Sequence, residues 1–246
     1  MNILNNIIIL LTASIEVNGV PFVERNNYAD RKKDYSYSIN KWIKNKNLRI
    51  IFCENTGSDL EFIHKLNEKN NLNLLEILSY NDNEDAKIKG KGFSELKLIN
   101  YVLKNSKIID ENSFIIKITG RYYLKNIKSY LSILSTQDLP FINVNFIKQM
   151  DMADSRIFGF RKIFFEQYLL KYFDRIDDNK NYFFEHALRD ATLQSMLEGH
   201  FRRPLPVLPI FDGYSGSTGK KLTAPYYKAW KRKLFYKIHL QESEYH

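Results

Sequence analysis

Residues 7–15 read IIILLTASI, a run of apolar side chains that takes in Thr12-Ala13-Ser14 near its end. A β-strand covered on both of its faces is apolar throughout, so this run predicts a buried first strand. The run is too short to cross a bilayer. It also lacks the basic segment and the small-residue cleavage site of a signal peptide, so we expect it to belong to the folded domain.

Strand and helix signals alternate after this run. Strands are expected at 49–53, 74–79 and 113–118. The expected helices between them are one that ends at Trp42, one that carries Leu60, Ile63 and Leu66 behind a cap at Ser58 or Asp59, and one that carries Leu96, Ile99, Val102 and Leu103. This repetition predicts a mostly parallel sheet. Ligands of such sheets bind outside the carboxyl ends of the strands, so the loops that begin at Thr12 and Thr119 are the places to look for chemistry.

The second half of the chain is less regular. Strands are expected at 141–147 and 156–161 and helices at 163–174 and 182–198. A length of 246 residues suits one large domain. We therefore expect an α/β fold with a single Rossmann-like domain over 1–224, in which helices flank a mostly parallel central sheet, followed by a basic, aromatic C-terminal helix over 225–246.

Composition narrows the class of protein. The single cysteine, Cys53, excludes a disulfide framework and a thiolate metal cluster, and it fits a reducing cytoplasm. The formal net charge of +9 indicates either an anionic partner or an Asn/Lys/Ile-rich composition without functional meaning. A Ser–His–Asp hydrolase is not supported, because the chain has no Gly-x-Ser-x-Gly segment.

Two basic segments predict anion binding. Lys89-Gly90-Lys91-Gly92, followed by Ser94 and Glu95 at an expected helix start, is either a phosphate-binding turn or a solvated loop with a good helix cap. In Lys117-Ile118-Thr119-Gly120-Arg121, the arginine can fork onto a diphosphate and the lysine can act as a point charge. The alternative is a surface arginine after a tight turn.

Three carboxylates are candidates for metal binding or proton transfer. Asp151 and Asp154, between two expected strands, could hold Mg²⁺ or Mn²⁺, or Asp154 could cap a strand end. Glu185, at an expected helix start, is either a general base or the partner of Arg189 four residues later.

Two C-terminal segments have several interpretations. Gly213–Lys220, which includes Ser215, Ser217 and Lys220, is either a small-residue phosphate cradle or a flexible loop. The tail at 225–246 could lie on an anionic membrane, stack on single-stranded nucleic acid, or dock on the core.

Together these segments resemble bacterial glycosyltransferases of polysaccharide and lipopolysaccharide assembly, of the O-antigen and capsule type and including galactofuranosyltransferases, with a GT-A-like nucleotide-sugar fold. The segments that carry the resemblance are Thr12-Ala13-Ser14, Gly90-Lys91-Gly92-x-x-Glu95, Lys117-x-Thr119-Gly120-Arg121-Tyr122, Ser155-Arg156-x-Phe158-Gly159-Phe160 and Ser215-Gly216-Ser217-Thr218-Gly219. The resemblance implies a nucleotide-diphosphate-sugar donor and a glycan or lipid-linked glycan acceptor.

The chain departs from that family at one point. Thr119-Gly120-Arg121 stands where GT-A enzymes usually have Asp-x-Asp, the metal-binding motif. Either Asp151 and Asp154 replace the missing metal ligands, or Arg121 and Lys117 supply the counter-charge of the diphosphate without Mn²⁺ or Mg²⁺.

The resulting hypothesis is sugar transfer in the cytoplasm, with a possible peripheral contact to the inner face of the membrane. Glu185 is the first candidate for the base and Asp154 the second. Donor contacts are expected from Thr12, Ala13, Ser14, Arg25, Tyr28, Lys91, Glu95, Lys117, Thr119, Gly120, Arg121, Ser215, Ser217 and Lys220. The alternatives are a nucleic-acid-binding protein that uses the tail and a sugar-phosphate nucleotidyltransferase; the leading hypothesis involves no nucleic acid.

Overall fold

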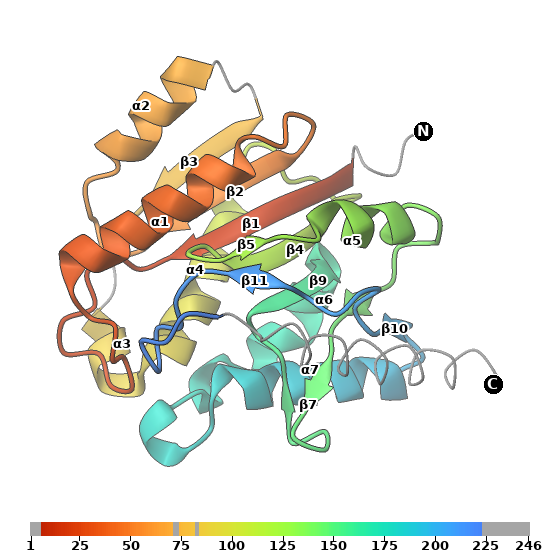
Figure 1. Cartoon of the computed structure of the whole chain (residues 1–246). Helices are drawn as coiled ribbons and strands as arrows, with labels where there is room; N and C mark the ends of the chain where they lie inside the picture. Colours follow the sequence, from red (N-terminus) through yellow and green to blue (C-terminus); the bar gives the residue numbers. More distant parts are fainter. Residues whose placement is uncertain (1–5, 71–73, 82–83, 223–246) are drawn as a thin grey trace.

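The computed structural model describes residues 6–70, 74–81 and 84–222, and a seven-stranded sheet forms its centre (Figure 1). The strand order is β10-β6-β9-β4-β1-β2-β3. The strands β1 (Ile7–Ala13), β2 (Arg49–Glu54), β3 (Leu75–Ser79) and β4 (Phe114–Thr119) pair in parallel. β9 (Ile157–Arg161) is antiparallel to β4 and to β6 (Ile142–Asn143), which pairs in parallel with β10 (Arg202–Arg203). The prediction of a mostly parallel sheet is confirmed.

Helices cover both faces of this sheet (Figure 1). One face packs against α1 (Tyr28–Trp42), α2 (Glu61–Asn70) and α5 (Ile127–Leu134). The other packs against α4 (Lys91–Asn105), α6 (Lys162–Gln167), the 3₁₀ segment η2 (Leu169–Arg175) and α7 (Phe184–Leu197). The predicted α/β class with flanking helices is therefore confirmed.

The first strand shows why the apolar run is continuous. Ile7, Ile9 and Leu11 pack into the cluster under α1, whereas Ile8 and Leu10 point into the cluster under α4. Successive strand residues face opposite sides of a sheet, so a strand between two helical layers needs apolar residues at every position.

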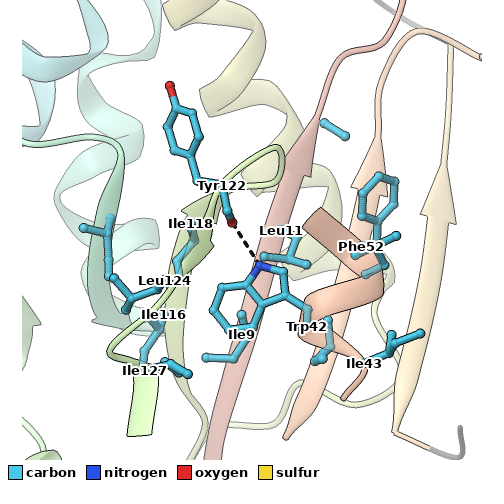
Figure 2. Close-up of a cluster of buried hydrophobic side chains, with 14 of the residues drawn as sticks. Ile9, Leu11, Trp42, Ile43, Phe52, Ile116, Ile118, Tyr122, Leu124 and Ile127 are labelled. Atoms are coloured by element: carbon cyan, nitrogen blue, oxygen red, sulfur yellow. Dashed lines mark hydrogen bonds between the residues drawn. The ribbon is translucent and has the colours of Figure 1, made fainter. Parts of the chain in front are cut away.

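Trp42, at the end of α1, fixes that helix on the sheet (Figure 2). Its ring is fully buried beside Ile9 and Leu11, and Nε1 donates a 2.9 Å hydrogen bond to the carbonyl of Tyr122. A buried indole N–H needs such a partner. The contact ties α1 to the chain that leaves β4, where one wall of the candidate site begins.

Three expected elements differ from the structure. The strand expected at 141–147 is broken into β6 and β7 (Phe146–Ile147), because Val144 N bonds to Arg203 O while β7 turns away to pair with β8 (Met152–Ala153). The helix expected at 163–174 changes from α6 to the 3₁₀ segment η2 after residue 167. α4 begins at Lys91, ahead of the expected start at Ser94.

Several short elements were not predicted from the sequence. They are α3 (Glu84–Lys89), α5, η3 (Asp178–Lys180), β5 (Tyr123–Leu124), β11 (Phe211–Asp212), β8 and β10. Most are too short to show a clear hydrophobic period.

Within residues 6–70, 74–81 and 84–222, no helix is both long enough and apolar enough to cross a membrane. The tail expected to form a basic helix, 225–246, lies outside the described residues.

Candidate functional site

A cavity of about 240 Å³ opens where β1 and β4 end. These are neighbouring parallel strands, so their carboxyl ends meet at one edge of the sheet, where ligands of such folds bind. The expected site residues in its lining are Thr12, Ala13, Ser14, Lys91, Glu95, Thr119, Arg121, Glu185, Ser215 and Ser217.

Side chains from three elements hold the end of β1 in place. The Ser14 hydroxyl donates to Oδ1 of Asn55 at 2.6 Å, and Nδ2 of Asn55 donates to the Ser94 hydroxyl at 2.6 Å. Arg31 on α1 donates to the carbonyl of Ser14 through Nε at 3.0 Å. Burial lowers the pKa of Arg31. Arg31, which is not among the residues expected from the sequence, is therefore a buried part of the cavity lining.

Two of the expected donor contacts, Arg25 and Tyr28, lie outside this lining. Nε of Arg25 pairs with Oδ2 of Asp34 at 2.5 Å, and the backbone N–H of Arg25 donates to the carbonyl of Gly216. Tyr28 is the first residue of α1 and is exposed. In this structure Arg25 joins α1 to the loop at 213–219.

The glycine-rich turn before α4 faces a carboxylate of the chain itself. Gly90 precedes the helix with φ 94°, and a Cβ there would lie 2.2 Å from Oδ2 of Asp178 in η3. Asp178 is 1% exposed, and its burial raises the pKa of the carboxyl to about 6. A helix N-terminus attracts negative charge, and here Asp178 supplies it. Lys91 still lines the cavity and donates to the Ser217 hydroxyl.

Lys117 lies behind the cavity wall rather than in it. Its side chain is fully buried, and Nζ is 2.5 Å from Oε1 of Glu95 and 2.6 Å from the carbonyl of Ser155. Oε1 of Glu95 also accepts from the Thr12 hydroxyl at 2.9 Å. The ammonium thus neutralises Glu95, whose side chain lines the cavity.

The loop at 213–219 packs against the side chain of Arg121. Nε of Arg121 donates to the carbonyl of Tyr214 at 3.0 Å, and a Cβ on Gly216 would lie 2.4 Å from Nη2. The loop is closed by backbone bonds, such as the one from Ser215 N to Lys220 O at 2.9 Å. The Lys220 side chain is exposed and outside the lining. Gly120, also outside it, donates its N–H to the carbonyl of Thr12 at 2.8 Å.

The two aspartates expected to hold a metal have other partners. Asp154 forms a two-point pair with Arg156, at 2.8 and 2.7 Å, and also accepts the backbone N–H of Arg156. Asp151 is 57% exposed and lies 3.7 Å from His186 Nε2. In the described part of the chain, no group of three or more His, Cys, Asp or Glu side chains could hold a metal ion.

Glu185 is the carboxylate best placed for chemistry. It lies in the first turn of α7 and lines the cavity, and its Oε1 accepts a 2.7 Å hydrogen bond from the Ser155 hydroxyl. Arg189, its alternative partner, pairs instead with Asp190 at 2.6 Å. The alternative of a surface pair with Arg189 is therefore not the observed arrangement.

Ser155, Arg156 and Asp178 also line the cavity, although none of them is among the site residues expected from the sequence. The string Ser155-Arg156 was visible as part of the family resemblance, whereas nothing in the sequence around Asp178 marks it.

Comparison with known proteins bears on the fold. No protein-family model matches the chain, and no curated protein matches it. The solved mannosyltransferase PcManGT from Pyrobaculum calidifontis, in complex with GDP-Man and Mn²⁺, is 9% identical with a TM-score of 0.50, over 93% of this chain and 60% of that chain. At this identity the likeness concerns the fold alone.

Two further structures have lower TM-scores. Galactosyltransferase LgtC, in complex with donor and acceptor sugar analogs, is 10% identical with a TM-score of 0.48, over 80% of this chain and 72% of that chain. A cytidylyltransferase from Leptospira borgpetersenii serovar Hardjo-bovis is 12% identical with a TM-score of 0.47, over 82% and 76%.

Proposed function

We propose that the protein is a glycosyltransferase that moves a sugar from a nucleotide-diphosphate sugar to a hydroxyl group of a growing glycan. The observation that carries the proposal is the charge of the cavity at the carboxyl ends of β1 and β4. Its lining holds four cations, Arg31, Lys91, Arg121 and Arg156. Of the acids there, Glu95 is neutralised by Lys117 from behind. Arg156 is paired with Asp154, so three further cations face the two remaining acids of the lining, Asp178 and Glu185. The surplus of positive charge that is left suits a diphosphate.

The nucleoside and the diphosphate of the donor would contact different parts of the cavity lining. Val17, Val20 and Ala86 pack together and line the cavity, so they form an apolar wall for the nucleoside, next to Thr12 and Ser14. Arg121 and Lys91 would neutralise the leaving diphosphate. Stabilising charge that develops in the transition state is usually the largest catalytic contribution.

Glu185 is the base that this geometry favours for an inverting transfer. Asp154, the second candidate, has both carboxylate oxygens bonded to Arg156. A positioned general base contributes roughly 10²- to 10⁴-fold to a rate. Glu185→Gln should lower transfer by at least that order, and a loss of only a few-fold would remove Glu185 from the mechanism.

The oxygen ligands that Asp151 and Asp154 offer do not fit a bound Mn²⁺ or Mg²⁺. A hard cation needs several free oxygen ligands, and the oxygens of Asp154 are held by a guanidinium. We therefore assign the counter-charge of the diphosphate to Arg121 and Lys91.

The acceptor we propose is a lipid-linked bacterial surface glycan of the O-antigen or capsule type, on the grounds of the family resemblance. The enzyme would then work at the cytoplasmic face of the membrane, with residues 1–224 as the transferase domain and the basic tail at 225–246 in contact with anionic lipid. Removal of 225–246 should lower co-sedimentation with anionic vesicles and leave donor binding unchanged. Loss of donor binding on this removal would contradict the assignment of donor binding to residues 1–224 and of lipid contact to the tail.

A thermal-shift panel of nucleotide sugars and bare nucleotides, each with Mn²⁺ and with chelator, tests the main proposal. A ligand that binds only the folded state adds about 2.7 kcal/mol of stability at a hundredfold excess over its Kd. A shift with one nucleotide diphosphate and its sugar is expected, and chelator should not abolish it. Stabilisation by single-stranded nucleic acid instead would refute the proposal, and turnover of a nucleoside triphosphate with pyrophosphate release would indicate a nucleotidyltransferase.

A further inference from the structure

Lys117 is a buried cation for which the proposed reaction has no direct use. Its side chain is fully buried in β4, the central strand of the sheet. A buried charge is costly unless it is paired and hydrogen-bonded. Here the ammonium is 2.5 Å from Oε1 of Glu95, donates to the carbonyl of Ser155 at 2.6 Å, and lies 3.4 Å from the Thr119 hydroxyl. Lys117 thus holds the backbone of Ser155 in one position.

Ser155 joins this buried pair to the cavity. Its carbonyl accepts from Lys117, while its hydroxyl donates to Oε1 of Glu185 at 2.7 Å. Ser155 is 7% exposed, so water does not compete freely for either bond. A hydroxyl has one proton to donate, and this proton is committed to one oxygen of the Glu185 carboxylate. The other oxygen, Oε2, is the one we assign to the acceptor hydroxyl.

We propose that Ser155 is a positioning residue for the catalytic carboxylate, anchored through its carbonyl by Lys117. The proposal rests on the proposed function, because it takes Glu185 as the base. Ser155 belongs to the connection between β8 and β9, whereas Glu185 lies on α7. The hydrogen bond therefore fixes the rotation of the carboxylate from a separate element, as pre-organised catalysis requires.

The experiment compares Ser155→Ala, Ser155→Thr, Glu185→Gln and the double variant Ser155→Ala/Glu185→Gln in the full chain. The substrate is the nucleotide sugar that gives the largest thermal shift, and water serves as the acceptor of the sugar. The readout is release of the nucleoside diphosphate in this hydrolysis. Ser195→Ala is the matched control, because Ser195 is a fully buried serine on α7 that donates only within its own helix, to Thr192 O.

Ser155→Ala should lower kcat by about 10- to 100-fold, the effect of a lost hydrogen bond to a charged group, with the donor KM within about 3-fold. Ser155→Thr, which keeps the hydroxyl, should retain most of the wild-type kcat. Ser195→Ala should leave kcat unchanged. The double variant should be no slower than Glu185→Gln, because residues that act as one unit are non-additive.

Additive losses in the double variant, or an unchanged kcat in Ser155→Ala, would overturn the positioning role while leaving the transferase proposal intact. If no nucleotide sugar binds the wild-type chain, the proposed function fails and this inference fails with it. If Glu185→Gln keeps its activity, Glu185 is not the base and Ser155 has no carboxylate to position.

Discussion

Asp178 should make the stability of the protein depend on pH in a predictable direction. Its carboxyl is 1% exposed, and burial raises its pKa from the ordinary 3.8 to about 6, with Glu185 adding to the rise and Lys91 opposing it. Below pH 3.8 the group is protonated in the folded and the unfolded chain. As the pH rises through about 6, the unfolded chain has already lost this proton while the folded chain still holds it, so the free energy of unfolding falls.

The size of this effect follows from the two pKa values. The interval from 3.8 to about 6, at 1.36 kcal/mol per pH unit, corresponds to about 3 kcal/mol. Asp178→Asn keeps the volume of the side chain and removes the titration. At pH 4 the unfolded chain has already lost part of this proton, so the free energy of unfolding of the variant, relative to wild type, should rise by about 2.5 kcal/mol between pH 4 and pH 8.

Urea unfolding of both chains at intervals from pH 4 to pH 8 measures this difference. Asp177→Asn is the control from the neighbouring position. The pKa of Asp177 is lowered, because its bonds to Lys180 and to the Asn179 N–H outweigh the effect of burial. The stability that Asp177 gains from this lowered pKa is already present above the ordinary value of 3.8, so the Asp177 variant should run nearly parallel to wild type from pH 4 to pH 8. Curves for Asp178→Asn that run parallel to wild type would refute the reasoning.

Three further predictions concern the walls of the cavity. Glu95→Gln leaves Lys117 buried without its counter-ion and should lower the free energy of unfolding by about 3–5 kcal/mol in urea titrations, with partial recovery in Glu95→Gln/Lys117→Met. Arg121→Ala should weaken binding of the bare nucleoside diphosphate by about 10- to 100-fold in isothermal titration; unchanged affinity would remove it from the diphosphate site. Gly90→Ala places a Cβ 2.2 Å from Oδ2 of Asp178 at φ 94° and should cost more than about 1 kcal/mol in thermal unfolding, and Asp178→Ala in the same chain should recover part of that loss.

The central strands of the sheet could be predicted from local sequence patterns. The alternation of Ile7, Ile9 and Leu11 with Ile8 and Leu10 needs only neighbours in sequence to be recognised as a strand buried on both faces. The parallel order of β1–β4 follows from the helices between them, because a parallel pair requires a crossover. Short or broken elements could not be predicted from local patterns. β6 and β7 divide one apolar run because the first half pairs with β9 and the second half pairs with β8.

The position of the candidate site was predictable from the residues that follow strand ends. Thr12 and Arg121 lie in the cavity because the carboxyl ends of β1 and β4 open there, which the order of elements already implied. The states of the charged groups were not predictable. Lys117 is neutralised by Glu95 from another element, and Asp178 is protonated more readily because the fold buries it against the start of α4. Sequence patterns indicate which face of an element is apolar. The pKa of a charged group depends on its burial and its partners, and these come from segments that are in contact only in the folded chain.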